Sequence, residues 1–312
     1  MISKLLILVV YLIFLINCTS IKAIESVSTL ERPTVPTEIY GPKDAEIALT
    51  LGNGGAGPTC ILQALSEDFI VLEGLEIRIA WIQSISRFTL KNLKEKVIDI
   101  SLTYESIPEL QAVQEGWASA RSLVFNDHFI IVGPKSNPAG ILPSDTPEVA
   151  FDKISQKGNF FSRDDLSGTN QRERMIWENI GMRPWENKPE WYITETLFPA
   201  DALRKSDDEN LYTITDRGTL LATQSELSNV GVFVQESESL INRCHAMLQN
   251  DPSPIAKKFL DYLKSSRAQS LIANYIGKDK SCIQCCPLFT PAEEDKFLEP
   301  NCLEKLGFSP QA

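Results

Sequence analysis

The stretch NFFSRDDLSGTNQRERMIWENIG, residues 159–181, joins a short apolar strand to a helix through a cluster of charged and hydroxyl residues. Ser167 or Thr169 can cap the helix, because a hydroxyl oxygen accepts from the free amides of the first turn. The same hydroxyls, with the amides of Gly168 and Thr169, can also reach an oxygen atom of a bound ligand. Arg163 adds a planar set of donors that matches an oxyanion. The stretch therefore predicts a strand–turn–helix unit with an anion site at its turn.

The same stretch also has a purely structural interpretation. A capped helix, preceded by Arg163 in an ion pair with Asp164 or Asp165, needs no ligand at all. The residue pattern alone leaves both interpretations open.

The pattern around this stretch alternates strands with helices, which indicates α/β units with a largely parallel, doubly wound sheet. We expect strands at 46–51, 75–82, 97–104, 128–134, 159–163, 191–195, 210–216, 230–235 and 241–248. We expect helices at 58–69, 86–96, 106–118, 148–158, 169–180, 217–227 and 254–276. This order fits two α/β lobes, each a sheet flanked by helices, with a ligand cleft between them.

We expect the following organisation of the chain: residues 1–23 a signal peptide, 24–44 a leader, 45–130 and 239–277 lobe 1, 131–238 lobe 2, and 278–312 a Cys-rich tail. Residues 1–23 combine Lys4 with an apolar run from Leu5 to Ile16, which is typical of a secretory signal and short for a membrane span. An uncleaved anchor is the alternative. We therefore expect a secreted protein, periplasmic or cell-surface if bacterial, without membrane insertion after cleavage.

The chain is acidic, with 30 basic and 41 acidic residues and a net charge of −11. Loss of the first 23 residues also removes two lysines, which leaves −13. Such a surface repels nucleic acid and anionic lipid, so a nucleic-acid partner is excluded.

Six cysteines remain after cleavage, and an even number in an exported chain favours disulfides. The disulfide candidates are Cys60, Cys244, Cys282, Cys285, Cys286 and Cys302, with the pairing open. The CxxC spacing of "CIQCC" is also found in zinc and redox sites, but no histidine lies nearby. We therefore expect no metal and no cofactor.

A second anion-friendly turn is "LGNGGAG", residues 51–57. Its glycines let the backbone approach a ligand closely, and the amides of the following helix are free to donate. Asn53, Gly54 and Gly55 are the candidate donors. A helix amino end carries about half a positive charge, so this turn can hold an anion without a basic side chain.

Several separated motifs resemble the tungstate-binding and related oxyanion-binding proteins of ABC transporters. "NDHFIIVGP", "FFSRDDLSGTNQRE", "WYITE" and "YTITDRGTLLA" occur here in the order in which that family has them. The resemblance covers residues 45–275 and implies a two-lobed type II periplasmic-binding-protein-like fold. It also implies a small oxyanion as ligand, bound between the lobes, and, if the chain is bacterial, a membrane transporter as partner.

The resemblance places the family's ligand-contacting arginine and threonine on Arg163 and Thr169. It places a family hydroxyl on Ser86, in the second binding turn. The first binding run of the family is rich in threonine, whereas this chain has the glycine turn there, and Tyr104 lies near the position of a family histidine. These departures leave the identity of the oxyanion open.

We expect two further motifs to be structural. In "TDRGT", residues 215–219, we expect Thr215 to cap the next helix and Asp216 to pair with Arg217. His128 follows an acid at a strand start, where a structural or surface role is expected.

Enzyme classes fit the sequence poorly. "DDLSGT" and "TDRGT" resemble aspartic-protease signatures only with Leu166 inserted and Arg217 in place of a small residue. The chain has two histidines and no G-x-S-x-G, which argues against a serine hydrolase. We expect a monomeric, non-enzymatic solute-binding protein for a small tetrahedral oxyanion. The alternative is an extracellular interaction or sensing module that kept the fold and lost oxyanion transport.

Overall fold

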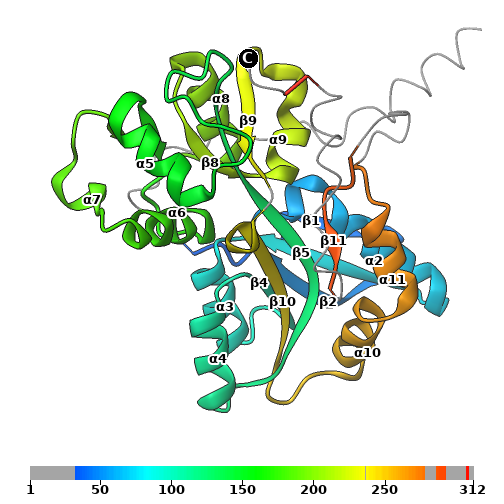
Figure 1. The fold of residues 1–312 in the computed structure, drawn as a ribbon. Helices are drawn as coiled ribbons and strands as arrows, with labels where there is room; N and C mark the ends of the chain where they lie inside the picture. Colours follow the sequence, from blue (N-terminus) through cyan, green and yellow to red (C-terminus); the bar gives the residue numbers. More distant parts are fainter. Residues whose placement is uncertain (1–31, 236, 278–285, 293–306, 309–312) are drawn as a thin grey trace, which may run out of the picture.

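One long strand, β5 (Ala118–Pro134), runs through both lobes of the protein (Figure 1). The computed structural model describes residues 32–235, 237–277, 286–292 and 307–308. The first part of β5 pairs with β10 (Ile241–Gln249), and its last part pairs with β8 (Thr213–Asp216) and β9 (Val230–Val234). The two lobes therefore share one strand, and the predicted two-lobed α/β fold is confirmed.

The sheet of lobe 1 is mixed rather than largely parallel. Its strand order is β1-β3-β2-β4-β10-β5-β11, in which β2 runs parallel to β3 and β4 while β1 and β10 pair antiparallel. The remaining strands are β1 (Glu38–Tyr40), β2 (Glu46–Asn53), β3 (Ile77–Gln83), β4 (Ile100–Thr103) and β11 (Thr290–Pro291). The parallel centre places the carboxyl ends of β2, β3 and β4 at one edge of the sheet, toward lobe 2.

Helices cover both faces of this sheet (Figure 1). α2 (Ile61–Glu73), α10 (Pro254–Leu263) and α11 (Ser266–Ala273) pack on one face, where Phe69 and Phe259 meet edge to face with ring centroids 5.0 Å apart. α3 (Ser86–Lys94) and α4 (Ser106–Gln114) pack on the other face around Leu93 and Met247. The short η2 (Gly57–Thr59) leads from β2 into α2.

Lobe 2 is built around an aromatic cluster. β6 (Phe160–Ser162) pairs parallel with β7 (Tyr192–Thr194), and the Phe160 ring contacts Phe151 at a tilt and Trp177 edge to face, with centroid distances of 5.0 and 5.3 Å. Its helices are α5 (Pro147–Lys157), α6 (Gly168–Asn179), α7 (Pro184–Asn187), α8 (Pro199–Glu209) and α9 (Arg217–Thr223), followed by η3 (Gln224–Glu226) and, before β10, η4 (Glu238–Leu240).

The closing segment of the chain contacts both lobes. β11 pairs antiparallel with β5 at Asn126 and Phe125, and the Thr290 hydroxyl lies 2.9 Å from His128 Nε2. The carbonyl of Phe308 accepts from Val232 N in β9 at 2.8 Å. His128 is therefore buried in a structural contact, and burial lowers its pKa to about 4.

Three expectations for secondary structure were wrong. Helix α8 was not expected, although Pro199 suits its first turn and the left-handed Asn210 its end. The single helix expected at 254–276 is two helices, because the Ser265 side chain accepts from Ala268 N and starts α11. The strand expected at 128–134 is the last part of a much longer strand.

The disulfide prediction was wrong for two of its six cysteines. Cys60 and Cys244 are both thiols: Cys60 Sγ donates to the Pro58 carbonyl, and Cys244 lies in the middle of β10. Each is buried in lobe 1, where it packs as a small apolar side chain. Cys286 is fully buried, and its pairing stays a prediction because Cys282, Cys285 and Cys302 lie outside the described residues.

The expected signal peptide and most of the leader and tail also lie outside the described residues. Among the helices of the described part, none is long and apolar enough to cross a membrane. The same part of the chain contains no group of three or more His, Cys, Asp or Glu side chains arranged to hold a metal ion.

Candidate functional site

The helices that lobe 1 directs toward lobe 2 begin without side-chain caps. No side-chain hydrogen bond caps η2, α2, α3 or α4. Among the other helices, side chains cap α5, α6, α9, α10 and α11, through Thr146, Ser167, Asp216, Ser253 and Ser265. The helices α7 and α8 of lobe 2 also begin without a side-chain cap. Some of the first amides in lobe 1 are nevertheless paired, among them Gly57 N with Asn53 Oδ1 and Ile61 N with Thr59 Oγ1. Because a helix start carries partial positive charge, this edge of lobe 1 still favours an anion.

The two lobes meet at these helix starts. A Cβ added to Gly168, the first residue of α6, would lie 3.9 Å from Tyr104 Cβ, directly after β4. A Cβ added to Gly218, in α9, would lie 3.1 Å from Thr59 Cγ2 in η2. The start of α6 therefore adjoins the residue after β4, and α9 adjoins η2, across the lobes.

In the first predicted turn, residues 51–57, the Asn53 side chain and the Gly57 amide already form hydrogen bonds within the protein. Asn53 Nδ2 donates to the Leu102 carbonyl at 2.8 Å, and Asn53 Oδ1 accepts from Gly57 N at 3.0 Å. Both polar atoms of this candidate ligand side chain therefore already hold the turn in shape. Gly54 lies next to the Ser84 carbonyl, and Gly55 faces open space, with no heavy atom within 4 Å of an added Cβ.

Two of the four glycines in this turn are required by packing. A Cβ on Gly57 would lie 1.8 Å from Trp81 Cζ2, and one on Gly52 would lie 2.5 Å from Ile98 Cδ1. Contacts this short do not occur between real atoms, so these positions exclude any side chain. The ligand-contacting role expected of Gly54 and Gly55 stays a prediction.

Gly57→Ala is expected to lower the free energy of unfolding by about 1–3 kcal/mol, because the added methyl displaces the buried Trp81 ring. Gly55→Ala is the matched control, two residues away in open space, and should change stability by less than about 0.5 kcal/mol. Urea denaturation of the ligand-free proteins measures both. Equal losses in the two variants would contradict the packing account.

The second predicted turn places Ser86 at the start of α3. It is the first residue of that helix and is partly exposed, while the neighbouring Ser84 hydroxyl is paired with Thr89 Oγ1 at 2.6 Å. Ser86 lies two residues after Ser84, which contacts Gly54, so the two lobe 1 turns adjoin each other.

Arg163 takes part in a buried ion pair. Its Nη2 pairs with Asp165 Oδ2, its Nε donates to the Leu197 carbonyl at 2.8 Å, and the two charged side chains are 10% and 4% exposed. The ion pair with Asp165, which the structural interpretation of Arg163 predicts, is therefore formed. Arg163 also lines a small pocket together with Thr169, Pro199, Ala202, Leu203, Thr213, Ile214 and Thr215.

Two other residues of this loop, Ser167 and Asp164, form hydrogen bonds or ion pairs that stabilise the loop and the start of α6. Ser167 caps α6 by accepting from Asn170 N, and its own amide donates to Asp165 Oδ1 at 3.0 Å. Asp164 pairs with Arg174 at 2.6 Å rather than with Arg163. Thr169 lines the pocket, and the cap of α6 is Ser167 rather than Thr169.

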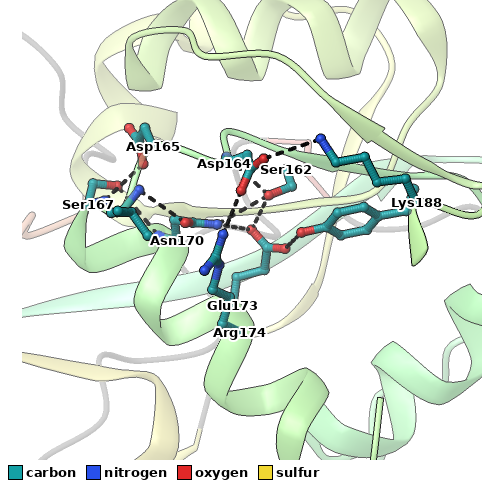
Figure 2. A network of polar contacts seen from close by, with 10 residues as sticks. Ser162, Asp164, Asp165, Ser167, Asn170, Glu173, Arg174 and Lys188 are labelled. Carbon is teal, nitrogen blue, oxygen red and sulfur yellow. Dashed lines mark hydrogen bonds and ion pairs between the residues drawn. The ribbon is translucent and has the colours of Figure 1, made fainter. Parts of the chain in front are cut away.

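A buried carboxylate stands behind the loop, as Figure 2 shows. Glu173 Oε2 accepts from Ser162 Oγ at 2.7 Å and Asn170 Nδ2 at 3.0 Å, and its Oε1 accepts from Tyr192 OH at 2.6 Å. Burial raises the pKa of Glu173 to about 7, and these hydrogen bonds oppose the rise. Sequence reasoning did not assign a role to this residue.

A second group of buried charges lies where β5 passes between the lobes. Burial raises the pKa of Asp127 well above its usual value, and the neighbouring Asp216 carboxylate adds to the rise. Burial lowers the pKa of Arg217 to about 10, so this guanidinium stays charged near neutrality, with Asp127 nearby. Asp127 lies in the motif "NDHFIIVGP", but no local pattern indicates that it is buried near Arg217.

The interpretation of "TDRGT" was wrong in both parts. Asp216, not Thr215, caps α9, accepting from Thr219 N at 2.7 Å and Thr219 Oγ1 at 2.6 Å. Both carboxylate oxygens of Asp216 therefore accept hydrogen bonds from Thr219 of the helix, and Asp216 does not pair with Arg217. Arg217 is 3% exposed, and its Nε and Nη2 have no hydrogen-bond partner.

Tyr104 lies between the first turn and the start of α6. Burial raises its pKa well above the ordinary value, and the neighbouring Asn53 opposes the rise. The next residue, Glu105, is also buried; burial raises its pKa, and a hydrogen bond with Gln171 in α6 opposes this. The lobes are thus held together by polar contacts as well as by packing at this point.

Two α/β lobes that share a crossing strand and meet at the starts of their helices define the class of two-lobed solute-binding proteins. The chain belongs to the PBP superfamily, because the PBP superfamily domain matches residues 59–267. The suspected relationship is thereby confirmed.

Relatives of this chain include the tungstate-binding protein TupA of Peptoclostridium acidaminophilum, 33% identical over 208 residues, which cover 64% of this chain and 70% of that protein. The solved structure of the tungstate-binding protein TupA from Desulfovibrio alaskensis G20 superposes with a TM-score of 0.68 at 26% identity, covering 80% of this chain and 100% of that one. The solved structure of the tungstate ABC transporter from Geobacter sulfurreducens superposes with a TM-score of 0.65 at 25% identity. The match covers 74% of this chain and 98% of that one.

Proposed function

We propose that this protein is an exported solute-binding protein that holds a small tetrahedral oxyanion, such as tungstate or molybdate, between its lobes. The observation that carries the proposal is the set of uncapped helix starts of lobe 1, taken together with the loop of lobe 2 that bears Arg163 and Thr169. The names of the relatives support the same ligand class. An ABC transporter in the membrane is the proposed partner, and the protein acts as a monomer without catalysis.

The chemistry of the site suits an anion stripped of water. The proposed donors are the backbone amides of Gly54 and Gly55, the hydroxyls of Ser86 and Thr169, and the guanidinium of Arg163. The amide N–H groups and the guanidinium can only donate hydrogen bonds, whereas the hydroxyls can also accept them. Hydrogen bonds to a charged acceptor are shorter and stronger than neutral ones, and a closed site of low polarity strengthens them further. Arg163 is the one cation of this set, and its pairing with Asp165 holds the guanidinium in place.

The proposal predicts that tungstate, molybdate, sulfate or phosphate raises the melting temperature of the protein. An anion at 100 times its dissociation constant adds about 2.7 kcal/mol to the free energy of unfolding. Differential scanning calorimetry with each anion, against chloride at equal ionic strength, measures the shift. A protein that responds to none of them has no such site.

A second candidate is an extracellular interaction or sensing module on the same fold. The observation that favours it is the C-terminal segment, whose β11 binds lobe 1 while Phe308 binds β9 of lobe 2, because this segment opposes the opening that transport requires. The absence of any thermal response to the four anions would favour this candidate.

A further inference from the structure

Glu173 is a buried acid that is held by neutral donors. Its side chain forms no ion pair within the described residues, and three hydrogen bonds from Ser162, Asn170 and Tyr192 surround the carboxylate (Figure 2). A carboxylate in this environment is expensive to bury, so its retention at the centre of lobe 2 calls for a role beyond packing.

Two of the three donors also hold the backbone of the loop in front of α6. Ser162 Oγ accepts from Asp164 N at 3.2 Å, and Asn170 Oδ1 accepts from Leu166 N at 3.1 Å. Asp164 and Leu166 have φ values of +45° and +59°, in the left-handed region that side chains disfavour. The strained turn therefore persists because Ser162 and Asn170 hold its amides, and Glu173 fixes both of these side chains.

The strained turn determines where the arginine of the candidate site lies. Arg163 precedes the first left-handed residue, and its partner Asp165 stands between the two. Any relaxation of Asp164 or Leu166 to ordinary φ values would rotate Asp165 and with it the guanidinium. Glu173 thus acts on Arg163 through the backbone, without touching the pocket that Arg163 and Thr169 line.

We propose that Glu173 is the positioning residue of the anion site, holding residues 163–167 in the one conformation that presents Arg163 to the ligand. The inference rests on the proposed function for its ligand. Its chemistry predicts that glutamine replaces Glu173 well: the amide oxygen accepts from Ser162 and Asn170, while the amide nitrogen donates to the Tyr192 hydroxyl. Alanine removes all three contacts.

The test compares Glu173→Ala and Glu173→Gln with Asp207→Asn, all in the full chain. Asp207 is the matched control, because it is a buried acid of the same lobe that holds a different loop through Ser228 N and Asn229 N. Calorimetric titration with tungstate should show at least a tenfold weaker affinity for Glu173→Ala and an affinity within threefold of the wild type for Glu173→Gln and Asp207→Asn. Equal affinities of all variants, or equal losses in Glu173→Ala and Asp207→Asn, would overturn the proposal.

Hydrogen exchange in the ligand-free proteins separates this inference from the proposed function. The amides of Asp164 and Leu166 should exchange at least tenfold faster in Glu173→Ala, while those of β5 stay protected and Glu173→Gln behaves like the wild type. This result stands even if no anion binds, in which case only the proposed function fails. Unchanged protection of both amides in Glu173→Ala shows that Glu173 does not position the loop.

Discussion

Arg163→Ala is expected to lower the free energy of unfolding by about 3–5 kcal/mol, even though the residue is proposed as a ligand contact. Removal of the guanidinium leaves the Asp165 carboxylate, 4% exposed, with the Ser167 amide as its remaining hydrogen-bond donor. An uncompensated buried charge of this kind is among the most destabilising single changes in a protein. Urea denaturation without ligand measures this loss, and calorimetric titration of the folded variant should find no binding of the anion.

The chain offers a control in the same loop. Arg174→Ala breaks the ion pair with Asp164, whose partners are both about one quarter exposed, and should cost no more than about 1 kcal/mol. The double variant Arg163→Ala/Asp165→Asn should regain at least half of the lost stability, since the neutral amide can still accept from Ser167 N, but should not regain anion binding. Equal losses in the two arginine variants would contradict the buried-pair account. Wild-type affinity in Arg163→Ala would remove Arg163 from the site.

The fold of this protein could be predicted from sequence because its signals are local. The strand–glycine turn–helix at the start of lobe 1 and the strand–loop–helix around Arg163 both follow from periodicity and turn chemistry over short ranges. The missed helix α8 is polar, and Phe198, which precedes it, provides no side-chain cap, so its pattern resembled a loop. Long strands such as β5 were predicted only in part, because residues 119–123 of β5 are at least partly exposed and lack a continuous apolar run.

The site was predictable only to the level of its segments. Sequence order located the two turns, but the choice between Asp164 and Asp165 as the partner of Arg163 depends on left-handed backbone angles at Asp164 and Leu166. Those angles follow from Glu173 and Asn170, which act from the next helix through side-chain contacts. The requirement for Gly57 likewise comes from Trp81, a residue 24 positions further along the chain. Such constraints arise in three dimensions and leave no local pattern.

Phe289→Ala is expected to lower the free energy of unfolding by about 3–5 kcal/mol, although the residue lies in the segment that the sequence assigned to a peripheral tail. Phe289 is 1% exposed and packs against Phe125 of β5, with ring centroids 5.0 Å apart. Around it, Leu288 N donates to the Tyr275 carbonyl at 2.9 Å and Ala292 N to Gln269 Oε1 at 2.8 Å. The segment is therefore part of the core of lobe 1, and removal of the ring leaves a cavity there.

Leu142→Ala serves as control, since that side chain is largely exposed, and it should change stability by no more than about 0.5 kcal/mol. If Phe289→Ala lowers the free energy of unfolding by no more than Leu142→Ala does, the segment around Phe289 is not packed on the core of lobe 1 in solution. Leu288 and Phe308 share one apolar cluster with Val232 of lobe 2 and Phe125 of lobe 1. Loss of Phe289 should therefore also ease the opening of the lobes, so stopped-flow measurements should find faster dissociation of tungstate from the folded variant. Unchanged dissociation would mean that the lobes open without displacing this segment.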